Sequence, residues 1–227
     1  LLTVTSYEMT YSKLPKSFDG YKIFQISDLH HANFGDNNDK ILKKINEFSP
    51  NIVVITGDLV SYVDTNFDNV YAFVKTITKK YDVYYVPGNH ELLLNDELRN
   101  EFYHGLENCN VKFLDNTFVS LKKDGQSINL YGLYYGLRYY DHSSIIDGGK
   151  NDNDIFYFGT KNIESTLGPI DANKFNLLIT HDPDYFDTYS KWGADLTLCG
   201  HIHGGLIRLP FIGGLVSPRV IFFPKYD

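Results

Sequence analysis

Five short polar blocks are spread along this 227-residue chain, and each follows an apolar run typical of a β-strand. In chain order they are Asp28-Leu29-His30, Gly57-Asp58, Gly88-Asn89-His90-Glu91, Thr180-His181-Asp182 and Gly200-His201-Ile202-His203-Gly204. If the apolar runs are neighbouring strands of α/β sheets, the polar blocks meet in the crevice beyond the strand ends. The fold is therefore expected to gather imidazoles and carboxylates from the whole chain at one place.

The pattern between the blocks alternates between strand and helix. Strands are expected over residues 21–26, 52–56, 83–86, 175–180 and 196–199. Helices are expected over residues 38–48 and 67–80, with a short one after Asp182-Pro183. Residues 114–133 predict a β-meander with a turn at 123–125, and residues 141–154 predict a long surface loop. This order predicts a layered α/β fold with a partly mixed sheet or two packed sheets, in a single domain over 1–227.

Composition excludes several classes of protein. The net charge of -7 argues against a general binder of nucleic acid or anionic membranes, which usually has a basic face. It does not exclude phosphate substrates, because two divalent cations can reverse the charge locally. Cys109 and Cys199 are too few for a disulfide scaffold, and two buried free thiols are the favoured interpretation. The sequence contains no run of 18 apolar residues that would predict a membrane span.

The first three blocks suit metal or phosphate chemistry, although each has an ordinary alternative. Asp28 and His30 are two residues apart, so at the end of an extended strand they point the same way and can hold one ion. Asp58 on a glycine turn can bridge two ions, but Gly-Asp is also common in turns. Asn89 offers an uncharged oxygen ligand. His90 suits a catalytic acid, because imidazole titrates near neutral pH, and its alternative is an ordinary loop histidine.

The last two blocks add three imidazoles. His181 follows a run that predicts a buried strand, so on its own it is more typical of a core histidine with satisfied hydrogen bonds. His201 and His203 are two residues apart between glycines, a pattern that suits ligands directed at adjacent metals. The alternative for this block is a polar turn. The five blocks in this order favour the metal interpretation over the five separate alternatives.

Together the blocks resemble the calcineurin-like metallophosphoesterase superfamily, and the resemblance covers roughly residues 21–209. It implies a four-layer α/β/β/α sandwich with two divalent metal ions at the strand ends. Carried over by position, one ion is held by Asp28, His30 and His203, and Asp58 bridges to the other. The second ion is held by Asn89, His181 and His201. His90, Asp58 and Asn89 are the residues expected to act in catalysis, with His90 facing the substrate phosphate.

Departures from the family pattern indicate which branch of the superfamily the chain resembles. Protein phosphatases of the superfamily have an aspartate and an arginine where this chain has Ser61 and Tyr62, so phosphoprotein substrates are not expected. Residues 204–227 resemble the bacterial membrane-associated branch, which is linked to phospholipids and nucleotide-lipid pyrophosphates. The chain begins at Leu1 without a methionine, and we expect an anchor or export signal upstream. We therefore expect the protein to be associated with a membrane or exported.

The expected activity is attack by hydroxide, bridged between two ions, on a phosphodiester, pyrophosphate or phosphomonoester, on its own or lipid-linked. Nitrogen and oxygen ligands suit manganese, iron and zinc alike. Two alternatives stay open: a nuclease, which the lack of a basic track disfavours, and a scaffold that binds metal without catalysis.

An aromatic run with one cation is interpreted either as a wall beside the site or as part of the core; it comprises Tyr134, Tyr135, Arg138, Tyr139 and Tyr140.

Overall fold

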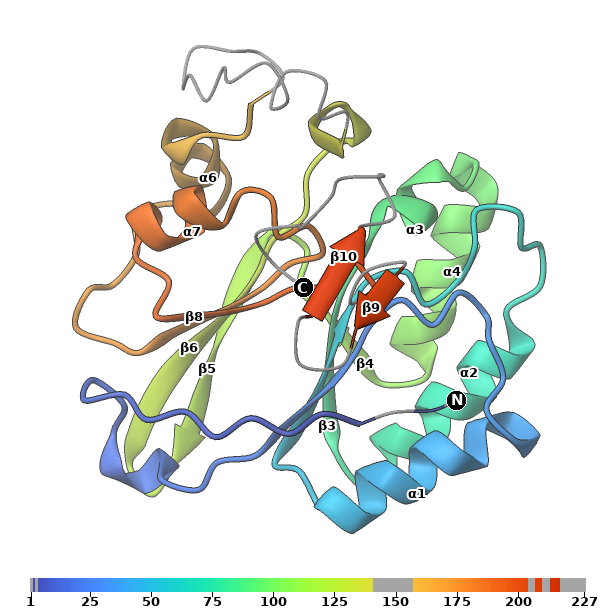
Figure 1. Ribbon diagram of the computed structural model, residues 1–227, viewed down its shortest axis with the longest axis horizontal. Coiled ribbons are helices and arrows are strands. Elements are labelled where there is room, and N and C mark those ends of the chain that lie inside the picture. The colour runs from blue at the N-terminus through green and yellow to red at the C-terminus, as the bar shows by residue number, and fades with distance from the viewer. Residues whose placement is uncertain (1, 3, 141–156, 204–206, 210–212, 217–227) are drawn as a thin grey trace.

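The protein is a sandwich of two four-stranded sheets with helices on both outer faces (Figure 1). The structure is a computed structural model, and it describes residues 2, 4–140, 157–203, 207–209 and 213–216. The first sheet is parallel throughout, in the order β1-β2-β3-β4. Its strands are β1 (Ile23–Ile26), β2 (Ile52–Thr56), β3 (Asp82–Val86) and β4 (Val111–Phe113).

The second sheet is mixed, in the order β5-β6-β7-β8. Its strands are β5 (Thr117–Lys123), β6 (Gln126–Gly132), β7 (Asn176–Ile179) and β8 (Leu196–Leu198). The β5–β6 pair is an antiparallel hairpin, and β6, β7 and β8 run parallel. A separate antiparallel pair is formed by β9 (Ile207–Leu209) and β10 (Gly213–Val216).

The helices divide between the two outer faces. The first sheet is covered by α1 (Asp39–Phe48), α2 (Asp68–Thr78) and α4 (Asp96–Asn108), and the second by α6 (Thr160–Leu167) and α7 (Phe186–Trp192). The short α3 (Asn89–Leu93) follows β3 directly. Three short 3-10 helices complete the described elements: η1 (Lys16–Phe18), η2 (Asp36–Asn38) and η3 (Leu137–Tyr140).

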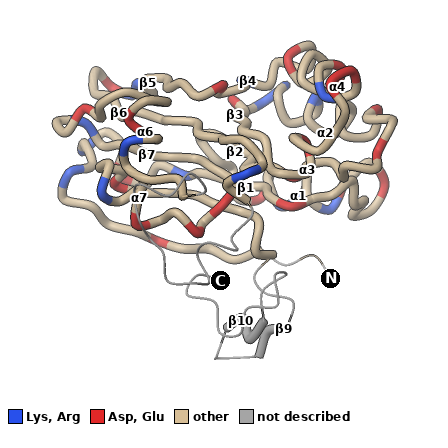
Figure 2. Tube along the Cα trace, turned by 90° about the horizontal axis from the view of Figure 1, so that it is seen from above, with Lys and Arg blue, Asp and Glu red and all other residues tan. Residues whose placement is uncertain are grey.

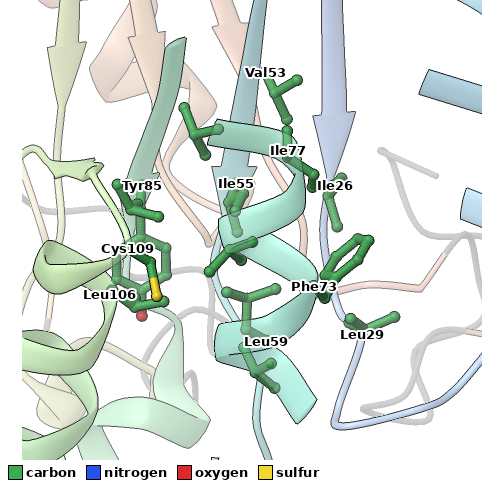
Figure 3. Close-up of a cluster of buried hydrophobic side chains, with 14 of the residues drawn as sticks. Ile26, Leu29, Val53, Ile55, Leu59, Phe73, Ile77, Tyr85, Leu106 and Cys109 are labelled. Atoms are coloured by element: carbon green, nitrogen blue, oxygen red, sulfur yellow. The ribbon is translucent and has the colours of Figure 1, made fainter. Parts of the chain in front are cut away.

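Side-chain alternation along the strands builds three layers of core. In β2, Val53 and Ile55 pack beneath the helices, while Ile52 and Val54 face the other sheet. Successive side chains of a strand point to opposite faces, so a strand buried on both faces is apolar at every position. Figure 3 shows part of the helix-side cluster, where Phe73 of α2 lies beside the strand residues. This layering confirms the predicted four-layer α/β/β/α sandwich.

Most predicted elements are confirmed within a few residues of their ends, including the 114–133 meander and all five strands. The helix after Asp182-Pro183 begins only at Phe186, so Pro183 precedes it instead of lying in its first turn. Sequence analysis missed α3, α4, α6 and β4. The loop predicted over 141–154 lies outside the described residues, as does most of the 204–227 segment.

The described residues contain neither a membrane-spanning helix nor a continuous basic track along the trace. Within the described residues, no helix is both long and apolar enough to cross a bilayer. Figure 2 shows lysines and arginines interspersed with acidic residues along the coloured trace, without a continuous basic track. Cys109 and Cys199 are free thiols; Cys109 is buried, as the favoured interpretation expects, whereas Cys199 is half-buried.

Candidate active site

All five polar blocks lie at the carboxyl ends of strands, as the sequence predicts. Asp28, Asp58 and Asn89 follow β1, β2 and β3 of the first sheet, whereas His181 and His201 follow β7 and β8 of the second. The carboxyl ends of parallel strands share one edge of a sheet, and the two sheets pack face to face. The site is therefore built where the same edge of both sheets meets.

The local backbone at the site differs from what we expected. Asp28 and His30 were expected to project from an extended strand end, but β1 stops at Ile26 and their φ angles are 54° and 46°. Asp58, His201 and His203 also have positive φ, at 52°, 74° and 53°. Residues other than glycine rarely adopt this left-handed conformation, and where they do it is concentrated at functional sites. Tight turns, not strand ends, aim these side chains.

Gly57 explains why one block begins with glycine. Its φ is 90°, and a Cβ built on it would lie 2.5 Å from the backbone nitrogen of Gly88 and 2.7 Å from Nδ1 of His181. No side chain fits at such distances. The turn after β2 therefore reaches the turn after β3 and the imidazole after β7 only because residue 57 lacks a side chain.

Three overlapping groups of three side chains could each hold a cation; two of them have no residue in common, and His30, Asp58 and His90 form the third. In the first, His203 Nε2 lies 3.2 Å from His30 Nε2 and 3.5 Å from an oxygen of Asp28. In the second, His181 Nε2 lies 3.2 Å from an oxygen of Asp58 and 3.1 Å from Nδ1 of His201. Asp58 Oδ2 is also 3.7 Å from His30 Nε2, so this carboxylate of the second group lies near the first group as well.

The side chain of Asn89 indicates that these residues suit a metal. Its side-chain oxygen is buried and has no hydrogen-bond partner among the described residues. A buried acceptor without a partner is costly, and a cation beside it removes that cost. Nitrogen and oxygen donors of this kind are typical ligands of divalent transition metals. The donor set therefore fits the two-metal expectation, although the structure carries no ions.

The contacts of His181 select one form of its ring. Its Nδ1 is 2.7 Å from the carbonyl oxygen of Thr56, so Nδ1–H donates there and leaves the lone pair of Nε2 facing the site. Burial opposes protonation of this imidazole. The hydrogen bond and charge of Asp58, together with the charge of Asp28, outweigh burial and raise the pKa of His181 to about 9 in the metal-free protein.

The pKa values of the neighbouring Asp58 and His30 are shifted as well. Burial opposes ionisation of Asp58, but the hydrogen bond and charge of His181 and the backbone of His90 lower its pKa to about 2. Burial lowers the pKa of His30. Asp58 is thus held as a carboxylate, the form in which it can share its oxygens between two cations.

Glu91 is a site residue to which sequence analysis gave no role. It is fully buried, and its carboxylate accepts hydrogen bonds from four backbone N–H groups. The donor nitrogens lie at 2.7–3.2 Å and belong to Gly88, Asp58, Leu59 and Val60. Burial and the charge of Asp58 raise the pKa of Glu91 to about 7, although the N–H groups of Gly88 and Asp58 act in the opposite direction. Glu91 therefore ties the turn after β2 to the turn after β3.

His90 is half-buried and belongs to the third of these groups, with His30 and Asp58. Its ring is 4.4 Å from that of His30, and its backbone N–H donates to Asp58 at 2.9 Å. The backbone N–H of Tyr62 points at Nδ1 of His90 over 3.4 Å. Nδ1 is then the acceptor, which places the proton of a neutral ring on Nε2. Tyr62, in the position of the missing phosphatase arginine, thus contacts this histidine through its backbone.

Some residues of the aromatic run belong to the core, and one lies beside the candidate site. Tyr135 and Tyr139 are buried in the core beneath α6 and α7. Arg138 donates to the hydroxyl of Tyr139 and lies over its ring. Tyr140 instead borders the site, with its ring centroid 5.5 Å from that of His201 and 6.2 Å from that of His181. The core interpretation is correct for Tyr135 and Tyr139, and the wall interpretation for Tyr140.

The sandwich with polar groups at the shared strand edge defines a class of phosphoester hydrolases. The calcineurin-like phosphoesterase family matches residues 21–205, which include the five blocks through Gly204, and the chain belongs to this family. It is accordingly a metal-dependent hydrolase acting on phosphoester bonds. The family typically uses two divalent metals.

Several curated relatives share the domain. "Uncharacterized metallophosphoesterase YkuE" of Bacillus subtilis (strain 168) is 28% identical over 96% of this chain and 70% of its own length. A metallophosphoesterase of Aquifex aeolicus (strain VF5) is 30% identical over 97% of this chain and 76% of its own. The bovine "Transmembrane protein with metallophosphoesterase domain" is 26% identical over 90% of this chain. The chain spans 45% of that bovine protein and 48% of a Campylobacter jejuni relative.

A solved structure has the same fold. The phosphopantetheinyl hydrolase PptH of Mycobacterium tuberculosis superposes with a TM-score of 0.53 over 80% of this chain and 83% of its own. Its sequence identity is 15%, so the likeness concerns the fold alone.

Proposed function

We propose that this chain hydrolyses a phosphodiester, pyrophosphate or phosphomonoester with two divalent ions held at the shared strand edge. Asp28, His30 and His203 would hold one ion, and Asn89, His181 and His201 the other, with Asp58 between them. The observation that carries the proposal is the pair of adjoining three-residue groups flanking Asp58, next to the unpaired oxygen of Asn89. Manganese, iron and zinc all suit this set of nitrogen and oxygen donors.

The chain's own residues supply positioning and a proton. When bound, two divalent ions lower the pKa of water and neutralise charge that develops on the phosphoryl oxygens. The contact of the Tyr62 N–H with Nδ1 leaves the proton of a neutral His90 ring on Nε2, from which it can donate to a phosphoryl oxygen or to the leaving oxygen. Glu91 keeps the turns of Asp58 and Asn89 at a fixed separation, so the ligands are arranged before substrate arrives.

A metal and activity assay tests this function. Protein loaded with manganese should hold about two ions per chain and should hydrolyse p-nitrophenyl phosphate or its bis-ester. A chelator should abolish the activity, and added metal should restore it. Preference for the bis-ester would support a diesterase. Metal binding without hydrolysis of either ester would refute the proposal and favour the scaffold alternative.

The nuclease alternative lacks support in the described structure. Figure 2 shows acidic residues interspersed among the lysines and arginines of the coloured trace, and the net charge of -7 does not favour a binder of the phosphate backbone. We expect a small or lipid-linked phosphate substrate instead. Hydrolysis of single-stranded DNA at a rate above that of the bis-ester would reverse this preference.

We also propose that the protein acts at a membrane. The bovine relative is named as a transmembrane protein, and several relatives extend well beyond the matched domain. Fractionation of cells that express the full gene product tests the idea. Recovery with the membranes is expected, and recovery entirely in the soluble fraction would contradict it.

A further inference from the structure

A cavity of about 360 Å³ lies between α4, the end of α3 and the start of η3. Its lining residues are Leu92, Arg99, Tyr103, Tyr134, Gly136 and Leu137. Cavities of this size accommodate small organic groups. None of these six residues belongs to the two cation groups at the strand edge.

Both walls of this cavity continue into the candidate active site. Leu92 is in the same short helix as His90, which begins directly at the end of β3. Leu137 starts the 3-10 helix that ends at Tyr140, whose ring contacts those of His201 and His181. α3 and η3 are in contact. Two elements that line the cavity, α3 and η3, therefore also carry His90 and Tyr140 of the candidate site.

The lining is mainly apolar and aromatic. Leu137 is 37% exposed, although large apolar side chains are more often buried. Tyr103 and Tyr134 provide two rings, and planar groups pack well against such rings. Arg99 is the charged lining residue, but it already donates to the carbonyls of Leu92 and Leu94 and pairs with Asp96.

We propose that this cavity binds the organic group esterified to the scissile phosphate, and that it prefers a planar aromatic group. This inference rests on the proposed function, because the phosphate has to occupy the strand edge for its ester group to reach the cavity. Tyr103, Tyr134 and Leu137 are then specificity-determining residues. The phosphate end is recognised at the strand edge, and the substrate is selected at the cavity.

Gly136 allows the cavity to be filled without backbone strain. A Cβ built on it meets no described atom within 4 Å, and its φ is not left-handed. Gly136→Trp should occupy the cavity, whereas Gly136→Ala adds one methyl group and serves as the matched control. Leu137→Gln, at an exposed lining position, is a second variant if the tryptophan disturbs folding.

The test compares phosphonates that differ only in their organic group. Inhibition constants of methyl-, butyl- and phenylphosphonate are measured on the manganese-loaded wild type and variants, with calorimetric binding in parallel. We expect phenylphosphonate to bind at least about tenfold more tightly than methylphosphonate to the wild type and to Gly136→Ala. Gly136→Trp should erase this difference while methylphosphonate binding stays within about twofold, and Leu137→Gln should reduce it.

Several results would overturn the inference. Equal binding of phenyl- and methylphosphonate to the wild type, or an unchanged preference in Gly136→Trp and Leu137→Gln, would exclude the cavity as a subsite. Butylphosphonate binding as tightly as phenylphosphonate would refute the aromatic preference. Failure of the proposed function is distinguishable: the loaded protein would then hydrolyse no ester, while calorimetry would still report on the cavity.

Discussion

At the scale of single residues, the carboxylate of Glu91 joins the two turns that carry Asp58 and Asn89. Its four N–H contacts are all made inside the protein, where an unpaired N–H group is costly. In the turn after β2, Gly57 and Asp58 adopt left-handed backbone, and for a residue other than glycine this conformation persists only when the surroundings enforce it. We infer that Glu91 is one of the groups that enforce it.

Glu91→Gln should destabilise the protein. A glutamine amide can accept on one oxygen, and its NH₂ group would face N–H donors that the carboxylate now satisfies. Leaving these unpaired should lower the free energy of unfolding by about 2–4 kcal/mol in urea titrations. Glu101→Gln, at an exposed position of α4, is the matched control and should have little effect. Unfolding of Glu91→Gln at the wild-type midpoint would show that Glu91 does not tie the turns together.

His90 should matter for turnover more than for metal content. We expect His90→Ala to lower kcat at least about tenfold, because a positioned acid is lost. Metal analysis beside the kinetics should still find the wild-type content. Because His90 also lies within reach of His30 and Asp58, loss of an ion in this variant would instead make it a ligand. Unchanged turnover would remove His90 from the mechanism.

At the scale of elements, the turns after the strands set the distance between the two halves of the site. The β2 turn touches the β3 turn and the imidazole after β7 at Gly57, where a side chain has no room. The same contact holds a group from the second sheet against the first. The turn is therefore as important to the site as the ligands that it presents.

Gly57→Ala should disrupt the site, and Gly125→Ala is its matched control. Both glycines have positive φ, at 90° and 79°, but a Cβ at Gly125 meets no described atom within 4 Å. The control should cost only about 1 kcal/mol of stability from its backbone conformation. Gly57→Ala adds a clash with backbone and should also lower metal content. Equal stability and metal content in the two variants would contradict the close-approach argument.

Most strands and the helices α1 and α2 could be predicted because their apolar patterns are strong, and α7 could be predicted from the Asp182-Pro183 pair before it. Runs such as that of β2 are apolar at every position, and α2 places Val70, Phe73, Val74 and Ile77 on one face. The missed elements bury less: α4 buries Phe102 and Leu106 among charged residues, α6 buries Ile163, and β4 has three residues. Such short or mostly polar segments are formed by tertiary packing more than by their own pattern.

The site was predictable as a set of residues but not as a geometry. The family resemblance assigned Asp28, His30 and His203 to one expected ion, and the structure places them together. Their left-handed backbone, the buried contacts of Glu91 and the role of the Tyr62 backbone depend on turns that sequence patterns do not define. Whether these side chains hold metal stays a prediction that metal analysis has to test.

At the scale of the whole molecule, the proposed ligands come from both sheets, so bound metal would join them. Chelation should therefore lower the Tm by roughly 5–10 °C relative to protein held at about 100-fold excess of metal over its Kd. Differential scanning calorimetry with and without manganese measures the shift. His90→Ala should retain it, whereas Asp58→Asn should lose most of it. A full shift, with full metal content, in Asp58→Asn would refute the bridging role.

Each sheet is also continuous in the sequence, since β1–β4 end at Phe113 and β5–β8 begin at Thr117. During synthesis from the N-terminus, the first sheet and its helices can pack while the apolar face meant for the second sheet is still uncovered. His201 and His203 leave the ribosome last among the groups of the site. The nascent chain therefore passes through a stage with an exposed sheet face, when Asp28, His30, Asp58 and Asn89 have been synthesised but His181, His201 and His203 have not.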